Sequence, residues 1–150
     1  MTMNEDEQIQ MLFSTLSIEQ KYAYCQTVEM FLSYVQDDIN LIGLSSLCEL
    51  TVTALNIDSG DALDFFSNNQ TIGPLYYLKT IRDKTILNCL IYTCSVIVGQ
   101  AIGAIDGKDC RELAKEHFQD WFHQLGYTDN DIKNAISKIN CFYPNITPNF

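Results

Sequence analysis

Residues 86–105 contain no Asp, Glu, Lys or Arg, so any fold of this chain has to keep that stretch out of water. Its length is close to the ~20 apolar residues that a membrane-spanning helix needs, and Gly99 and Gly103 have the Gly-x-x-x-Gly spacing that lets membrane helices pack closely. Four polar residues interrupt the stretch: Asn88, Thr93, Ser95 and Gln100. Because a bundle also needs one helix that is apolar almost all round, we expect a buried central helix over 86–105, with the glycines at a tight helix crossing. A membrane-associated segment is the alternative.

The rest of the chain carries helix signals separated by short gaps, with little sustained alternation of apolar and polar residues. Ser17 and Gln20 form a capping box that predicts a helix over 17–37, and Asp106-Gly107 is a turn dipeptide. Similar signals predict helices near residues 4–16, 39–56, 58–66, 74–81, 109–125 and 128–139. We therefore expect an all-α, single-domain bundle of seven to eight helices over residues 1–150. The order of elements fits a duplicated helix-pair unit of residues 17–70 and 85–140, and equally an ordinary bundle.

The net charge of −10 lies entirely in the first half of the chain. Residues 1–78 hold 11 acidic residues and a single base, Lys21, whereas residues 79–150 hold 8 acids and 8 bases. A one-sided negative field repels phosphate backbones and attracts a cationic partner. An acidic half also keeps a small cytoplasmic protein soluble, and the charge count alone does not separate these explanations. We expect no binding to nucleic acid.

The six cysteines predict core packing, not disulfides. The residues before Leu16 include Glu5, Asp6 and Glu7 and no base, unlike a signal peptide, so we expect a cytoplasmic location with reduced thiols. No pair has the Cys-x-x-Cys spacing of a zinc or redox site, and most of the cysteines have apolar neighbours at helical spacing.

No catalytic motif is present in the sequence, so we expect neither enzymatic activity nor a cofactor. His117 and His123 are six residues apart on one expected helix and point to different sides, so they cannot chelate one ion together. Glu112, Glu116 and Asp120 recur every four residues, but neighbouring bases favour a solvated, salt-bridged helix face over a metal site.

These observations favour an acidic binding protein of the kind that bacterial immunity and antitoxin proteins represent, which blocks a basic, nuclease-type toxin. Carboxylates would supply the attraction and tyrosines the anchors, although the two tyrosines also suit the core or boundary of their helix. The residues expected to bind the partner are Asp37, Asp38, Glu49, Asp58, Asp61, Asp64, Tyr76 and Tyr77.

A second hypothesis comes from Ala104-Ile-Asp-Gly-Lys108 with Glu112, followed by Leu125-Gly-Tyr-Thr-Asp-Asn-Asp131. These segments resemble the tellurite-resistance TerB-like domains, small helical proteins with an acidic Asp-Gly turn between helices. The resemblance implies a stress-response or metal-associated module, with Asp106, Asp109 and Glu112 as ligands of a divalent ion. The first half has Asp37-Asp38 in place of the family's Asp-Gly turn.

Overall fold

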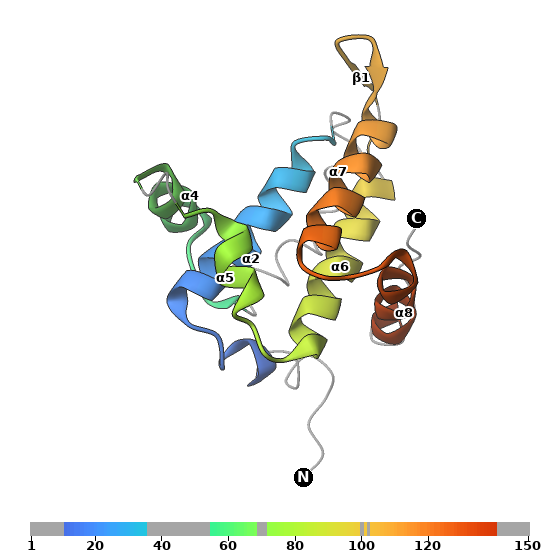
Figure 1. Ribbon diagram of the computed structural model, residues 1–150. Coiled ribbons are helices and arrows are strands. Elements are labelled where there is room, and N and C mark those ends of the chain that lie inside the picture. The colour runs from blue at the N-terminus through green and yellow to red at the C-terminus, as the bar shows by residue number, and fades with distance from the viewer. Residues whose placement is uncertain (1–10, 36–54, 69–71, 100, 102, 141–150) are drawn as a thin grey trace.

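The protein is an all-α helical bundle with one short β hairpin (Figure 1). The computed structural model describes residues 11–35, 55–68, 72–99, 101 and 103–140. The helices are α2 (Ile18–Leu32), α4 (Ser59–Asn68), α5 (Pro74–Lys79), α6 (Lys84–Gly99), α7 (Cys110–Gln124) and α8 (Asp129–Asn140). The hairpin strands are β1 (Ala104–Ile105) and β2 (Lys108–Asp109). The expected helix over 39–56 lies outside the described residues apart from its end at Leu55 and Asn56, and of the expected helix over 4–16 only residues 11–16 are described.

Helix α6 is the central helix, as the uncharged stretch predicts. All residues from Ile86 to Gly99 except the half-buried Asn88 are buried. It packs against α2 on one side and against α7 and α8 on the other, while α4 and α5 pack on α2 (Figure 1). None of the helices in the described ranges has the length and apolar character that crossing a membrane requires. The part of the uncharged stretch that lies in α6 is thus buried by the other helices, whereas Gly103 and Ala104 are exposed.

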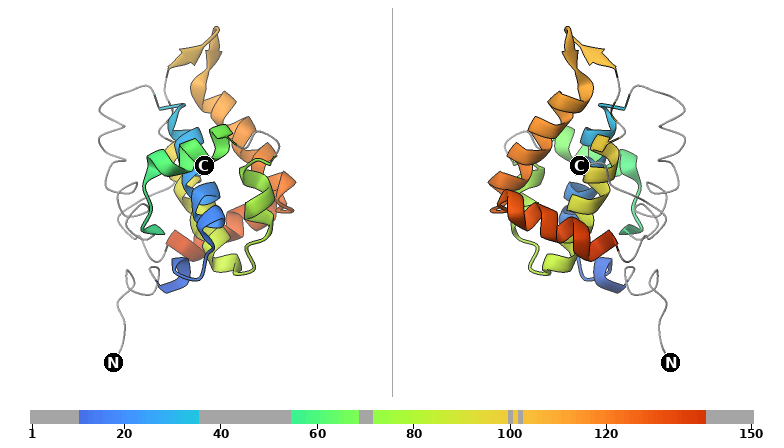
Figure 2. Two further views of the ribbon diagram at one scale, coloured as in Figure 1. Left: turned by 90° about the vertical axis from the view of Figure 1, so that its left-hand side faces the viewer. Right: turned by 90° about the vertical axis from the view of Figure 1, so that its right-hand side faces the viewer.

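The predicted span of this helix is wrong at its end, because α6 stops at Gly99 and not at Ile105. Gly103 has a φ of 101°, which is incompatible with an α-helix, so it marks the exit toward the hairpin and does not take part in a helical crossing. Asp106 and Gly107 form the turn with φ of 53° and 79°, the left-handed pair that a tight two-residue hairpin requires. The hairpin projects beyond one end of the helices (Figure 2).

Local capping signals place the helix starts where the sequence predicts them. The hydroxyl of Ser17 accepts from the backbone N–H of Gln20 at 3.1 Å, and the Gln20 side chain accepts from the Ser17 N–H at 2.9 Å. Thr128 and Asp131 make the same reciprocal pair at the start of α8. Pro74 is the first residue of α5, as expected.

The C-terminal end of α2 differs from the prediction. The helix ends at Leu32, five residues before Asp37, because the chain tightens there into three-residue turns. The N–H of Tyr34 donates to the carbonyl of Phe31, and the hydroxyl of Ser33 donates to that of Met30. Val35 is still buried, so the apolar pattern continues past the end of the helix.

The cysteines of the described ranges fill the core, as their apolar neighbours predict. Cys25, Cys89, Cys94 and Cys110 are all buried. Burial, with a smaller effect of Asp83, raises the pKa of the Cys89 thiol to about 12. That thiol therefore stays protonated and acts as a small apolar side chain. Cys48 and Cys141 lie outside the described residues.

Candidate functional site

Five aromatic side chains from α2, α4 and α5 form one connected group on the surface, which we call the aromatic cluster. Phe65 of α4 lies at its centre, with ring centroids 5.4 Å from Tyr22, 5.0 Å from Phe66 and 5.8 Å from Tyr77. Tyr77 also lies 6.2 Å from Phe66 and 5.2 Å from Tyr76. These distances fall in the range of favourable aromatic pairs, so the three helices are joined through their rings.

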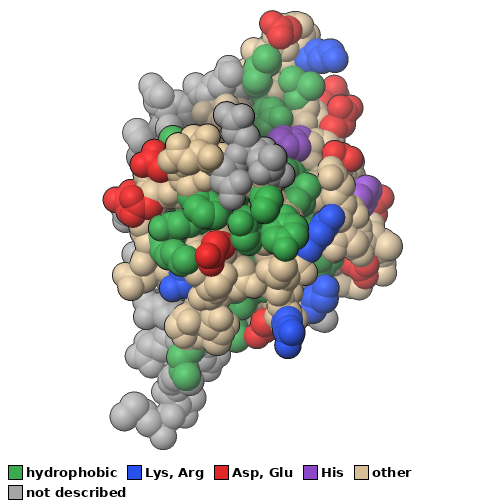
Figure 3. Space-filling model, turned by 60° about the vertical axis from the view of Figure 1, so that its left-hand side comes forward, with side chains coloured by type: hydrophobic (Ala, Val, Ile, Leu, Met, Phe, Trp, Pro, Cys, Tyr) green, Lys and Arg blue, Asp and Glu red, His purple; other side chains and the backbone are tan. Residues whose placement is uncertain are grey.

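The cluster is open to solvent on its outer side. Tyr76 is 58% exposed, and Leu63, on the same helix as Phe65, is 54% exposed, while the other four rings are half-buried. Figure 3 shows hydrophobic side chains gathered across the middle of the face on the side of α4 and α5. Contiguous apolar surface of this kind marks a contact site more often than isolated exposed residues do.

Helix α4 and Asp58, the residue just before it, also bring three carboxylates to this part of the surface. Asp58, Asp61 and Asp64 are exposed and three residues apart, which keeps them on one side of the helix. None of them forms an ion pair with a described base. Asp58 has a structural task as well, because its Oδ1 accepts from the backbone N–H of Gly60 at 2.7 Å. We call these carboxylates, Leu63 and the aromatic cluster together the acidic-aromatic surface.

The structure thus brings together five of the eight residues that the sequence nominates for partner binding. Tyr77 packs on Phe65 and Phe66, the rings of the helix that carries Asp61 and Asp64. Asp37, Asp38 and Glu49 lie outside the described residues. Neither tyrosine belongs to the core: Tyr76 is exposed, and Tyr77 is half-buried at the boundary of its helix.

Four members of the surface are not among the nominated residues: Tyr22, Leu63, Phe65 and Phe66. Tyr22 lies within the helix expected over 17–37, and its half-buried ring contacts Phe65. Leu63 follows a buried residue, Ala62, and carries no signal of its own. A count of aromatic residues at neighbouring positions would have pointed to Phe65 and Phe66, but not to their partners on other helices.

The carboxylates suggested by the TerB-like resemblance lie at the hairpin. Asp106 is in the turn, and Asp109 caps α7, its Oδ1 accepting from the N–H groups of Arg111 at 2.8 Å and Glu112 at 3.3 Å. Across the described ranges, no three His, Cys, Asp or Glu side chains are grouped so that they could hold one metal ion. Metal binding at these residues stays a prediction.

The two histidines point to different sides of α7, as their spacing requires. His123 is exposed, and its Nε2 lies 2.7 Å from Oδ1 of Asp129. His117 is half-buried, and its Nδ1 lies 2.9 Å from the hydroxyl of Tyr34. Burial lowers the pKa of His117, and the nearby Asp120 opposes this in part. A neutral ring beside Tyr34 fits a packing role, with Phe31 and Trp121 as further ring neighbours.

Comparisons of the chain with protein-family models, with curated proteins and with solved structures found no match.

Proposed function

We propose that the protein is a non-catalytic, acidic binding protein of the immunity or antitoxin type, which blocks a basic, nuclease-type toxin by docking the acidic-aromatic surface on it. The observation that supports this most directly is that α4 bears two carboxylates without an ion-pair partner among the described residues, Asp61 and Asp64, together with half-buried rings that connect through Tyr77 to the exposed ring of α5. A nuclease binds phosphates through a basic surface, so a carboxylate-rich protein can occupy the same surface.

The charges and the rings have different tasks in this proposal. The carboxylates of α4 draw the cationic partner in and orient it, an effect that weakens as salt screens the field. The rings supply the affinity, because aromatic side chains that become buried at the centre of an interface carry most of its binding energy. Tyr76 exposes the most ring surface and is the first anchor to test.

The test requires a basic partner, identified by crosslinking in the native cell or from an adjacent reading frame that encodes a basic toxin domain. Association with the purified partner is then measured at low and high salt for the wild type and for an Asp61→Lys/Asp64→Lys double variant. We expect the double variant to associate at least about tenfold more slowly at low salt and to show a flatter salt dependence.

The matched control is Glu112→Lys/Glu116→Lys, which makes the same change of net charge at exposed positions of α7. If only net charge matters, both double variants slow association equally, and a docking role for α4 is wrong. If co-expression of the wild type does not protect cells from the toxin although the two proteins bind, the blocking function is wrong and only binding remains.

A further inference from the structure

A pocket lies between α6 and α8, away from the acidic-aromatic surface. It has a volume of about 290 Å³ and is lined by the first two turns of both helices and by Gly126 and Tyr127 from the turn between α7 and α8. In Figure 1, α8 and α4 are on opposite sides of the molecule, so this pocket is separate from the proposed docking surface. Its volume is just below the range of about 300–1,000 Å³ typical of drug-sized ligands, which suits a small metabolite.

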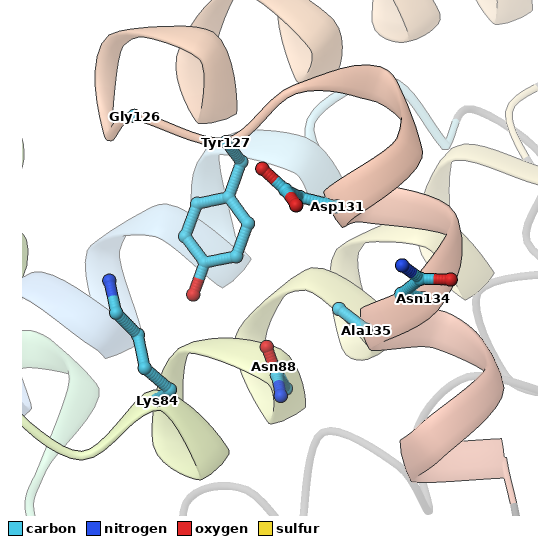
Figure 4. A pocket seen from close by; sticks show the side chains of 7 residues that line it. All are labelled: Lys84, Asn88, Gly126, Tyr127, Asp131, Asn134 and Ala135. Atoms are coloured by element: carbon cyan, nitrogen blue, oxygen red, sulfur yellow. The ribbon is translucent and has the colours of Figure 1, made fainter.

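One buried polar group of the pocket has unmet hydrogen-bonding capacity, and a lysine without an ion-pair partner lies near it. The Tyr127 hydroxyl is buried and has no hydrogen-bond partner among the described residues. The ammonium of Lys84 lies 5.3 Å from the centroid of the Tyr127 ring and pairs with no described carboxylate. Figure 4 shows the hydroxyl between the side chains of Lys84 and Asn88. Because buried hydroxyls in folded proteins are nearly always paired, this arrangement points to a missing acceptor.

The two sides of the pocket carry opposite charge. Lys84, Tyr127 and Asn88 offer hydrogen-bond donors on the side of α6, where a carboxylate would be bound. On α8, the carboxylate of Asp131 lies beside the Tyr127 ring, and Asn134 lies further along the helix (Figure 4). The Oδ2 of Asp131 accepts from the backbone N–H of Thr128 at 3.0 Å, and the hydrogen bonds from Thr128 lower the pKa of this exposed carboxyl, which is therefore ionised near neutral pH.

We propose that this pocket binds a small zwitterion with a carboxylate and a protonated amine, the chemistry of a free amino acid. The carboxylate is held by the Lys84 ammonium, the Tyr127 hydroxyl and the Asn88 amide, and the amine faces Asp131. The ligand reaches the hydroxyl when the exposed side chain of Lys84 turns away from the tyrosine ring. Lys84 forms no ion pair with a described residue, so this motion gives up only its contact with the tyrosine ring and a weaker attraction to Asp131.

The test is calorimetric titration of the full chain with glycine, β-alanine and γ-aminobutyrate, which place the two charges at increasing separation. Acetate, methylammonium and inorganic phosphate serve as probes with one kind of charge. We expect at least one zwitterion to bind about tenfold or more tightly than acetate and methylammonium, since each charge-assisted hydrogen bond contributes that much. The proposal is overturned if no zwitterion binds, or if acetate or phosphate binds as tightly as the best zwitterion.

Variants connect the binding to the named groups. Tyr127→Phe removes only the unpartnered hydroxyl, so it should fold normally and bind at least about fivefold more weakly. Lys84→Met should weaken binding as well, whereas Lys79→Met, an exposed lysine of α5 outside the pocket, should not. Asp131→Asn keeps an acceptor for the Thr128 N–H and should abolish the preference for zwitterions over acetate. Unchanged binding in Tyr127→Phe and Lys84→Met, with normal circular dichroism, would place the ligand elsewhere and refute the site.

Discussion

Three successive residues of α5 allow binding to be separated from folding. Tyr76 is 58% exposed, Tyr77 is half-buried against Phe65 and Phe66, and Leu78 is 0% exposed. Each is replaced by Ala, which keeps the helix propensity high, so the change in stability reports the side-chain contacts that are lost. The exposed fractions predict a steep rank order along the helix.

The expected magnitudes follow from burial. Full burial of a large apolar side chain contributes about 1.5–3 kcal/mol. Because Tyr76 is 58% exposed, only its buried part contributes, and Tyr76→Ala should lower the free energy of unfolding by only about 0.6–1.3 kcal/mol. Tyr77→Ala loses contacts with three rings, at about 0.5–1.5 kcal/mol for a favourable aromatic pair, and should cost more. Leu78→Ala leaves a cavity in the core and should cost about 2–5 kcal/mol. All three variants should fold, because domains of this size are stable by about 5–15 kcal/mol.

Urea unfolding followed by circular dichroism measures these differences, with the slope of the transition checked for constancy. Met11→Ala, at a residue 57% exposed outside the cluster, is the control for loss of an exposed apolar side chain. If Tyr76→Ala destabilises the protein as much as Leu78→Ala, the ring belongs to the core and the acidic-aromatic surface is not an open one. If the order holds, Tyr76→Ala becomes the variant that tests partner binding in a folded protein, with an expected affinity loss of about 2 kcal/mol or more.

Three further predictions concern local structure. The lowered pKa of His117 means that its contribution to stability is fully present above pH 6.5, the value of an unperturbed histidine, and is lost as pH falls through the lower pKa of the folded protein. His117→Asn should therefore flatten the dependence of Tm on pH in the acidic range, and an unchanged slope would contradict this. Asp109→Ala removes the acceptor of two N–H groups and should cost about 0.5–2 kcal/mol in urea unfolding, whereas Asp109→Asn should retain most of the cap. Gly107→Ala should lower the free energy of unfolding by about 1 kcal/mol, because the φ of +79° is unfavourable for alanine even though the space around a Cβ is open. Gly107→Asn should lower it less, because asparagine adopts this left-handed conformation more readily. Equal losses in the two variants would point to a packing effect.

The parts of the fold that the sequence predicts well are those set by local chemistry. Ser17 with Gln20, Thr128 with Asp131 and Pro74 act within one helical turn, so their patterns identify helix starts directly. Burial of α6 from Ile86 onward follows equally from its composition, since a helical segment without charged residues has to be covered. Each of these features can be predicted from a short stretch of sequence, without knowing which other segments pack against it.

The features that the sequence misses depend on backbone geometry or on distant partners. The strands of the hairpin are two residues long, too short to show a period of two, and only the positive φ of Gly103 shows that the apolar stretch continues without being helical. The aromatic cluster joins Tyr22 to Phe65, which are far apart in sequence, and helical spacing cannot reveal such a contact. Charge counting locates the acidic half of the chain but not which carboxylates share a surface.

The separation of charges from rings on the acidic-aromatic surface gives the proposed interface a kinetic signature. Long-range attraction by Asp61 and Asp64 acts before contact, so charge reversal should change mainly the association rate and its salt dependence. Contacts of the rings form only in the bound complex, so truncation of Tyr76 should change mainly the dissociation rate. If charge reversal accelerated dissociation instead, the carboxylates would be desolvated inside the interface rather than at its rim. The rings would then be one part of a mixed polar interface and not its anchor.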